Sequence, residues 1–519
     1  MVAISLARIA FAAIAGALLA APLHAQNAAK LYAEHCASCH GPERLGGLGP
    51  ALLPENLERL RQPAAVQVIA KGRLATQMAG FGDKLSAADV ESLAAYIYTR
   101  PAVVPPWGMD EIRASRTEFK PERPDSDKPI HRANPLNLFV LVETGDHHAS
   151  ILDGDKFERL ARFPTRYALH GGPKFSPDGR FVYFASRDGW IAKYDLHNLR
   201  MVAEVRAGIN TRNAAVSSDG RWVMVANYLP HTLVVIDALT LQPVKIIPAK
   251  DMAGRSSRVS AVYDAAPRKS FIAALKDVKE IWEIPYGADA EPVYKGLVHD
   301  YKMKEGIAEP GPFPVRHIEV DDYLDDFFFD RNYANLVGTA RDAKNGQVVN
   351  LHVKRRIETI ALPGMPHLGS GITWDWQGRP VLATPNLKDA QVTVIDTQSW
   401  KVIRQIPTNG PGFFMRSHEN TPYAWVDAFN SPRKDTMQVI DKRTLEVVRD
   451  LRPAPGKTAA HVEFSMDGRF ALVSIWENEG EVIVYDAATL EIVKRLPANK
   501  PSGKYNVHNK ITRSDGTSH

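Results

Sequence analysis

The stretch from residue 176 to residue 184 is Ser-Pro-Asp-Gly-Arg-Phe-Val-Tyr-Phe, a tight turn followed directly by an apolar run. Asp-Gly between apolar segments predicts a β-hairpin, because glycine accepts the positive φ that a tight turn requires. Similar stretches return at 217–225, 377–382 and 465–473, with Gln-Gly at the turn of the second of these. Each is followed by another apolar run that ends in aspartate, as in Tyr194-Asp195.

This repeat predicts a β-propeller. Repeating units of about 40–60 residues with about four short strands each are typical of propeller blades. We expect blades to start near residues 137, 172, 214, 258, 318, 371, 415 and 462. These starts predict eight blades over 137–519, with seven as the alternative. The unit near 318 is the least regular. Its acidic and aromatic run, Asp321–Asp330, is either an insertion that faces a ligand or partner, or a solvated loop.

The N-terminal residues 1–25 have the pattern of a secretory signal peptide. Arg8 supplies a positive charge, Ile9–Ala21 is apolar but too short to span a bilayer comfortably, and Leu23-His24-Ala25 suits cleavage. The alternative is an uncleaved membrane anchor. No later stretch is long and apolar enough to span a membrane, so we expect a periplasmic protein with no membrane span after removal of the signal.

The chain has only two cysteines, and both lie in Cys36-Ala37-Ser38-Cys39-His40. This is the attachment pattern of a c-type haem, in which both thiols form thioethers with the haem vinyl groups. The neutral imidazole of His40 is then the expected proximal iron ligand. The sequence therefore predicts one covalent haem c.

The residues around this motif predict a small all-α domain of the class I cytochrome c type over 26–100. Helices are expected over Lys30–His40 and Ser86–Tyr98, the second with Ser86 as its N-cap. Met78 lies between these helices and is the only methionine between residues 40 and 100. We expect Met78 to be the sixth iron ligand, which raises the potential and suits electron transfer.

Residues 101–136 are rich in proline and charge and are interpreted as a linker between the two domains. The whole chain is thus expected to be multidomain, an all-α cytochrome c followed by an all-β eight-bladed propeller. The formal net charge is 64 − 59 = +5 over 519 residues. There is no dense Lys/Arg run, so nucleic acid is not an expected partner.

A Cys-x-x-Cys-His domain joined to this propeller resembles the cytochrome cd1 nitrite reductase family, whose propeller holds haem d1. The resemblance covers nearly all of the chain after residue 25. Four segments carry it: Pro105–Met109, Tyr167–His170 with the following Gly179-Arg180, Ser186–Gly189 and Gly503–Val507.

The resemblance implies a set of ligands for haem d1. His170 matches the proximal iron ligand of the family. Cationic side chains that the family places near the edge of haem d1 are matched by Arg187, Arg212, Arg258 and Lys276. Haem d1 carries several carboxylates, and the planar guanidinium of arginine suits carboxylates.

Two departures from the nitrite reductase pattern change the expected activity. Nitrite reductases have two distal histidines, of which His367 matches one, while the other is missing near Asp325 and Asp326. A further histidine, His461, lies in Ala459–Phe464, where nitrite reductases have none. Both features resemble the paralogous dihydro-haem d1 dehydrogenases. Membership of that group implies oxidation of a propionate side chain to an acrylate, the last step of haem d1 biosynthesis.

Removing two electrons and two protons needs a base and an electron acceptor. We expect His461 to be an iron ligand or the base, and His367 to be a proton acceptor near the propionate. His170 would be an iron ligand or an alternative ligand. Tyr505 would donate a hydrogen bond to a carboxylate, or else be a core tyrosine. The electrons would leave through haem c.

Two other functions remain open from the sequence. One is nitrite reduction to nitric oxide, and the other is a non-catalytic haem d1 carrier, against which the cytochrome motif argues. The expected partners of a dehydrogenase are its substrate dihydro-haem d1, a periplasmic redox protein as electron acceptor, and cytochrome cd1 nitrite reductase as acceptor of the product.

Overall fold

The structure of the protein is a computed structural model that describes residues 27–46, 49–57, 60–72, 78–101, 103, 106–169, 171–295, 307–339, 345–513 and 515–517. It divides into two compact units, Met1–Pro106 and Trp107–His519. The expected signal peptide lies outside the described residues and stays a prediction. Among the residues that are described, no helix is long and apolar enough to cross a membrane.

The first unit is all-α. Residues 27–35 are helical, and they are followed by α2 (Ala37–His40), α3 (Gln62–Lys71) and α4 (Ala87–Ile97). The expected N-cap of α4 is confirmed, because Ser86 Oγ accepts a hydrogen bond from the Asp89 amide at 3.2 Å. The apolar faces of these helices share one core, which includes Tyr32, Leu57, Ala65, Ile69, Val90, Leu93 and Ile97.

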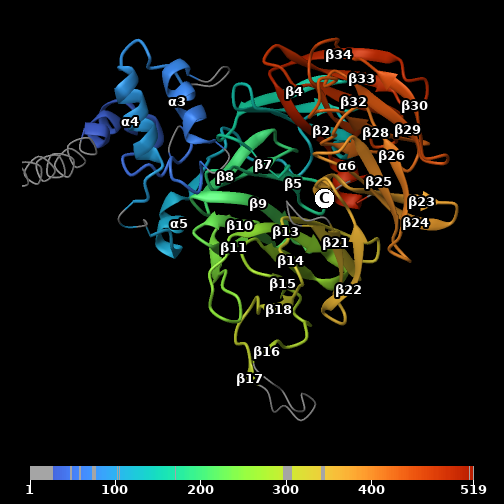
Figure 1. Cartoon of the computed structure of the whole chain (residues 1–519), viewed down its shortest axis with the longest axis horizontal. Helices are drawn as coiled ribbons and strands as arrows, with labels where there is room; N and C mark the ends of the chain where they lie inside the picture. The colour runs from blue at the N-terminus through green and yellow to red at the C-terminus, as the bar shows by residue number, and fades with distance from the viewer. Residues whose placement is uncertain are drawn as a thin grey trace, which may run out of the picture. The chain divides into compact units, whose positions relative to one another are not determined.

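The second unit is an eight-bladed β-propeller, as predicted, and not a seven-bladed one (Figure 1). Each blade is a four-stranded antiparallel sheet, and its innermost strand lines the central channel. In the order of blades 1 to 8, the innermost strands are β35 (Pro501–Asn506), β5 (Lys174–Phe175), β9 (Asn210–Val216), β13 (Val259–Ala265), β19 (Asp326–Phe329), β23 (Ile372–Trp376), β27 (Met415–Arg416) and β31 (Ala459–Phe464).

The three outer strands of each blade follow their innermost strand in the chain, except in blade 1. The second strands are β2 (Leu138–Glu143), β6 (Phe181–Ala185), β10 (Trp222–Leu229), β14 (Ser270–Leu275), β20 (Asn335–Thr339), β24 (Arg379–Pro385), β28 (Tyr423–Asp427) and β32 (Phe470–Ile475). The third strands are β3 (His148–Asp153), β7 (Trp190–Asp195), β11 (Thr232–Asp237), β15 (Glu280–Pro285), β21 (Asn345–Asn350), β25 (Gln391–Asp396), β29 (Met437–Asp441) and β33 (Gly480–Asp486). The outermost strands are β4 (Glu158–Pro164), β8 (Arg200–Arg206), β12 (Pro243–Pro248), β18 (Arg316–Glu319), β22 (Arg355–Ala361), β26 (Val402–Pro407), β30 (Glu446–Leu451) and β34 (Ile492–Ala498).

The ring is closed by the C-terminal end of the chain. Strand β35 pairs with β2 so that Tyr505 lies opposite Val140. Blade 1 therefore combines both ends of the unit, which leaves no open sheet edge at the closure. Short helix α6 (Val507–Thr512) follows β35, and two further single turns are η2 (Ala266–Arg268) and η4 (Leu368–Ser370).

Blade 5 starts later than the sequence suggested. Residues 316–319 form the outermost strand of blade 4, because a hairpin of β16 (Tyr294–Lys295) and β17 (Ile307–Ala308) precedes that strand. The run Asp321–Asp330 is neither an insertion nor only a solvated loop. Its second half is β19, in which the three phenylalanines 327–329 are buried.

Most of the expected linker over 101–136 belongs to the propeller unit. Helix α5 (Met109–Ser115) buries Ile112 completely against the core of blades 2 and 3. Strand β1 (Thr117–Glu118) pairs with β8 as a fifth strand of blade 2, and η1 (Pro135–Asn137) leads into β2. Burial of apolar groups such as Ile112 outweighs the loop-like composition of this segment.

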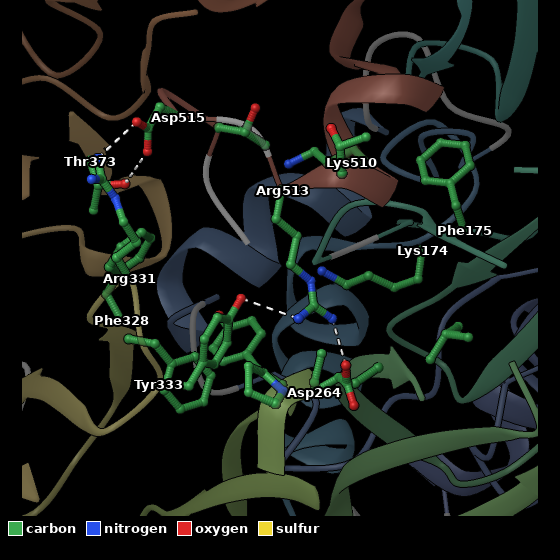
Figure 2. Close-up of a pocket in the computed structure, with 18 of the residues that line it drawn as sticks. Lys174, Phe175, Asp264, Phe328, Arg331, Tyr333, Thr373, Lys510, Arg513 and Asp515 are labelled. Atoms are coloured by element: carbon green, nitrogen blue, oxygen red, sulfur yellow. Dashed lines mark hydrogen bonds and ion pairs between the residues drawn. The ribbon is translucent and has the colours of Figure 1, made fainter. Parts of the chain in front are cut away.

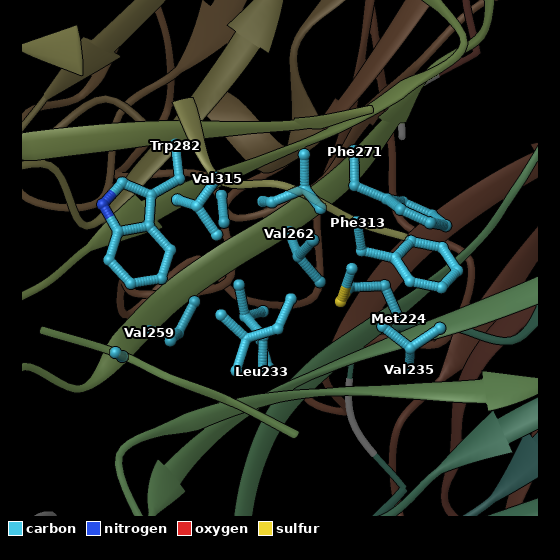
Figure 3. Close-up of a cluster of buried hydrophobic side chains, with 14 of the residues drawn as sticks. Met224, Leu233, Val235, Val259, Val262, Phe271, Trp282, Phe313 and Val315 are labelled. Carbon is cyan, nitrogen blue, oxygen red and sulfur yellow. The ribbon is translucent and has the colours of Figure 1, made fainter. Parts of the chain in front are cut away.

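The core lies between neighbouring blades. Figure 3 shows the cluster between blades 3 and 4, in which Met224, Leu233 and Val235 face Val259, Phe271 and Trp282. Because each sheet is covered on both faces by its neighbours, the inner strands are apolar on both faces. This packing explains why the strands of the repeat are continuous apolar runs. Polar residues can lie instead at the strand ends near the channel.

Candidate functional site

The cytochrome unit places the Cys-x-x-Cys-His motif for haem attachment. The His40 side chain is only 7% exposed, and its Nδ1 lies 2.8 Å from the carbonyl oxygen of Pro50. A carbonyl oxygen can only accept, so Nδ1 carries the proton and Nε2 keeps its lone pair for iron. Burial also lowers the pKa of His40, which favours the neutral ligand form.

The other residues of the motif fit a covalent haem c. Cys36 is half-buried, Cys39 is exposed, and neither forms a disulfide. Burial, and then the neighbouring Cys39, raise the pKa of the Cys36 thiol to about 11. Met78 is half-buried in the segment that returns along α3, where Phe81 N donates to the Ile69 carbonyl at 2.9 Å. Its role as the sixth ligand stays a prediction.

Gly49 provides a test of the haem c site. A Cβ atom at Gly49 would lie 2.7 Å from Cε1 of His40, closer than two carbons can approach. We expect Gly49→Ala to tilt the imidazole and to reduce the fraction of protein with a six-coordinate, low-spin haem c. Absorption spectra of the oxidised and reduced protein measure that fraction. Ser38→Ala, at an exposed position between the cysteines, is the control. Identical spectra for Gly49→Ala and wild type would contradict this account of His40.

In the propeller unit, the predicted residues gather at one end of the channel. All innermost strands run in the same direction, so residues at their starts lie at the same mouth. Blades 2 to 4 bring the cations Arg187, Arg212, Arg258 and Lys276. Blades 6 and 8 bring His367 and His461. Tyr505 of blade 1 lies near the end of β35, and its ring reaches the His461 ring, with 5.1 Å between their centroids. The mouth therefore has a cationic half and a half with two histidines.

The cations of the mouth have acidic partners that the sequence did not reveal. Arg258 forms a bidentate pair with Asp277, with a shortest distance of 2.7 Å. Lys276 Nζ lies 2.7 Å from Asp325 Oδ1, and both cations face the ring of Tyr228 at 5.4 and 5.6 Å from its centroid. Such pairs hold the cations in place until a carboxylate ligand competes for them.

Arg187 belongs to a loop of blade 2, and His170 precedes β5 of the same blade in the sequence. Arg187 is half-buried, its amide donates to Ala168, and its carbonyl accepts from Thr211. His170 lies outside the described residues, so its expected role as an iron ligand stays a prediction. Just before it, Ala168 has a φ of +43° and Leu169 forms a bridge to Ser186, which ties this segment to the loop that contains Arg187.

β-Bulges place several mouth residues. The pairing register shifts at Arg212 in β9, at Ser260 in β13 and at His461 in β31, so the Cα pairing between the strands skips each of these residues. A bulge re-aims the side chain of the extra residue, and bulges are frequent next to active sites. His461 also has a φ of +49°, an uncommon value for a non-glycine residue. Nothing in the local sequence distinguishes these positions from ordinary strand residues.

His461 is the least satisfied histidine of the site. It is fully buried, and within the described part of the chain neither ring nitrogen has a hydrogen-bond partner. Burial, followed by the charge of Lys504, holds the pKa of His461 well below its ordinary value. Buried polar groups normally have partners. The neutral imidazole of His461 is therefore suited to bind the iron of a bound molecule or to act as a base.

His367 is oriented by the loop before β27. Its Nδ1 lies 2.6 Å from the carbonyl oxygen of Phe413, so Nδ1 donates and Nε2 is left as the basic atom. Burial lowers the pKa of His367, and the Asp326 carboxylate acts in the opposite direction. The histidine is therefore neutral at the start of a reaction and has an acidic group nearby once it accepts a proton.

Asp427, which no sequence pattern indicated, links both histidines. Its carboxylate accepts hydrogen bonds from the amides of Phe413 and Phe414, at 2.7 and 3.1 Å, and from the amide of His461 at 3.5 Å. Burial raises the pKa of Asp427 to about 6. Asp427 thereby holds the loop that orients His367 and the bulge that presents His461.

Aromatic rings complete this side of the mouth. The His461 ring packs against Phe414 at 4.8 Å and against Tyr505 at 5.1 Å between centroids. Phe413 packs against His367 at 4.3 Å. Tyr505 is half-buried, and burial raises its pKa to about 12, so its hydroxyl stays protonated and can donate. Part of the ring packs on the core of blades 1 and 2, so the core interpretation of Tyr505 also stands.

These features define a class of protein: an all-α cytochrome c joined to an eight-bladed propeller whose mouth combines cations, aromatic rings and two imidazoles. Residues 133–302 and 307–510 match the family model described as "Cytochrome D1 heme domain". Residues 24–97 match "Cytochrome C oxidase, cbb3-type, subunit III". The chain belongs to the cytochrome d1 haem domain family, and a cytochrome c domain precedes that domain.

The similar proteins span nearly the whole chain. "Dihydro-heme d1 dehydrogenase" of Pseudomonas aeruginosa is 56% identical over 489 residues, which are 94% of this chain and 95% of that protein. A solved structure, "Dihydro-heme d1 dehydrogenase NirN in complex with DHE", superposes with a TM-score of 0.86 at 55% identity, covering 93% of this chain and all of that one. "Nitrite reductase" of Stutzerimonas stutzeri is 25% identical, with 92% of each chain covered.

Proposed function

We propose that this protein is an oxidoreductase, a dihydro-haem d1 dehydrogenase, that converts a propionate side chain of dihydro-haem d1 to an acrylate. The observation that carries the proposal is His461, a fully buried imidazole with two unpartnered nitrogens beside an aromatic wall. The high identity to the dehydrogenase of Pseudomonas aeruginosa over almost the full length supports the same conclusion.

The reaction turns –CH2–CH2– into –CH=CH– and releases two protons and two electrons. The carboxylates of the substrate meet the cationic half of the mouth, where Arg212, Arg258 and Lys276 would bind them. Nε2 of His367 accepts a proton from the side chain. His461 binds the substrate iron or serves as a second base, and the Tyr505 hydroxyl donates a hydrogen bond to a carboxylate.

The cytochrome unit provides for the electrons. Cys36 and Cys39 would hold haem c through thioethers, with His40 and Met78 as its axial ligands. When bound, haem c takes electrons one at a time and passes them to an external acceptor. The need for such an exit explains why the binding propeller is joined to a cytochrome, which a simple carrier of haem d1 does not require.

The location and the partners follow from the same proposal. The signal-like residues 1–25 support a periplasmic protein. A small periplasmic redox protein would accept the electrons. Cytochrome cd1 nitrite reductase would accept the product, because it is a relative that shares the propeller family and requires haem d1 as its cofactor.

The direct test is to mix the full-length protein, containing haem c, with dihydro-haem d1 and an electron acceptor under anaerobic conditions. We expect the absorption spectrum of the substrate to change to that of haem d1. Binding of the substrate without this change would contradict the dehydrogenase and favour the carrier.

A nitrite assay with a reduced electron donor separates the other alternative. At the position of the missing distal histidine, β19 begins with Asp326, whose carboxylate already accepts from Tyr263 and from its neighbouring amide. We therefore expect little nitrite turnover, because no histidine is present at this position to donate a proton to nitrite. Nitrite turnover comparable to the rate of substrate oxidation would favour the nitrite reductase.

A further inference from the structure

A cavity lies at the other end of the propeller channel. It has a volume of about 400 Å³ and is lined by the far ends of β9, β13 and β19, by α6 and by residues that follow α6. Figure 2 shows Lys174, Lys510 and Arg513 around it, with Asp264 and Asp515. None of the predicted site residues lines this cavity, so the site described above does not account for it.

The proposed reaction requires a route by which protons leave the site, and this cavity can provide one. Each turnover releases two protons at the mouth, and the flat macrocycle of the substrate would cover that mouth while the reaction proceeds. Proton transfer requires groups within hydrogen-bond reach, directly or through water. A route from His367 toward the far end of the channel would avoid the substrate.

The first step of such a route is from His367 to Asp326. Gly369 follows His367 in the turn that begins η4, and a Cβ at Gly369 would lie 2.5 Å from Asp326 Oδ2. The turn and the carboxylate are therefore in direct contact. Asp326 Oδ1 accepts a hydrogen bond from the Tyr263 hydroxyl at 2.9 Å, and Tyr263 lines the cavity.

The second step is from Asp326 to Lys174. Lys174 Nζ lies 5.7 Å from the centroid of the Tyr263 ring, and both residues line the cavity. In Figure 2 the Lys174 side chain extends from β5 toward Arg513. A water molecule in the cavity would be within reach of the ammonium, since the walls are polar and the space is far larger than one water molecule.

We propose that Asp326 and Lys174 carry the proton accepted by His367 to this cavity, and from there to the far face of the propeller. This inference rests on the proposed dehydrogenase function. Asp326 and Lys174 act as proton relays after the chemical step, so neither needs to contact the substrate. The relay consumes nothing else: for each proton that His367 accepts, one proton reaches the solvent and the histidine returns to its neutral form.

Four charged groups face Lys174. They are Asp326 on β19, Arg416 on β27, and Arg513 and Lys510 from the C-terminal segment. Burial lowers the pKa of Lys174 to about 8, Asp326 opposes this change, and Arg513 and Arg416 add to it. Arg513 itself is held by Asp264 and Tyr333 and keeps its charge. Burial also lowers the pKa of Lys510, well below its ordinary value, so Lys174 and Lys510 are the two lysines of this group whose protonated form is disfavoured.

The relay predicts a definite pH dependence. Lys174 must be neutral to accept a proton, so turnover should rise as the pH increases toward about 8 and then level off. Arginine at this position keeps the positive charge but cannot lose its proton. Lys174→Arg should therefore remove the rise in turnover near pH 8. If Lys174 were only a structural cation, arginine would replace it without loss of turnover.

The experiment compares turnover from pH 6 to 9 in the full-length protein containing haem c. We expect Lys174→Arg and Lys174→Met each to lower turnover at least ~10-fold while binding dihydro-haem d1 as wild type does. Lys193→Met is the matched control. Lys193 is a buried lysine of blade 2 whose pKa burial also lowers to about 8, but its Nζ donates to the Leu239 carbonyl away from the cavity. It should keep the wild-type profile.

Full turnover and an unchanged profile in Lys174→Arg would overturn the relay while leaving the dehydrogenase in place. Failure of the wild type to oxidise the substrate would instead refute the function on which the relay rests. Should either Lys174 variant fail to fold, Asp326→Asn gives the same test, because an amide can hold the Tyr263 hydrogen bond but cannot carry a proton. Wild-type turnover in Asp326→Asn would equally overturn the relay.

Discussion

Replacing His461 by phenylalanine should lower turnover of dihydro-haem d1 by about 10²–10⁴-fold and leave the propeller folded. Neither ring nitrogen of His461 has a hydrogen-bond partner in the described part of the chain, so the substitution breaks no hydrogen bond. The ring packs between Phe414 and Tyr505, where a phenyl group has similar shape. The melting temperature should therefore stay the same or rise, because an unsatisfied polar group is removed.

The turnover is measured from the absorption change of substrate to product, and the spectrum of the bound substrate separates the two roles of His461. Loss of an iron ligand would change that spectrum on binding, whereas loss of a base would leave it unchanged and slow only the conversion. His418→Asn is the control, since His418 is equally buried but lies outside the mouth, with Nδ1 accepting from the amide of Asn420. Turnover of His461→Phe close to that of wild type would refute the assigned role.

The double substitution Cys36→Ser and Cys39→Ser should abolish multiple turnover. Without thiols, no thioether can attach haem c, and the electrons from the substrate lose their exit. The propeller unit has its own cores between its blades, so it should still bind dihydro-haem d1.

Substrate binding and turnover are measured on the same preparation of the full-length variant, with the single substitution Ser38→Ala as control. The expected result is unchanged binding with no steady conversion to haem d1. Sustained turnover in the absence of covalent haem would show that the electrons leave by another route, and it would contradict the role given to the cytochrome unit.

Much of the architecture could be predicted because its determinants are local. Residues 176–184 contain both the turn and the strand that follows, and the repetition of this pattern predicts a propeller. The choice between eight and seven blades came from the strand pairing. The motif of Cys36, Cys39 and His40 is likewise contained within five residues, and thioether chemistry leaves few other interpretations. The choice of His367 and His461 came from resemblance to a family, and the structure places both at the mouth.

Contacts between distant segments could not be predicted in this way. The start of blade 5 was placed too early, because β18 has the composition of a first strand but pairs with β15 as an outermost one. Asp277 and Asp325 were not recognised as partners of Arg258 and Lys276, since ion pairs between different loops leave no mark on sequence spacing.

The sequence by itself determined the cytochrome motif, the repeated sheets of a propeller and the types of residue that reach the mouth, because hairpins and attachment motifs are encoded within a few neighbouring residues. Only the tertiary structure decided where those side chains point. His461 is presented by a β-bulge whose backbone is held by Asp427 and Lys504, from two other blades. The position of His461 between these two blades depends on closing the ring of blades, which no segment of the chain specifies alone.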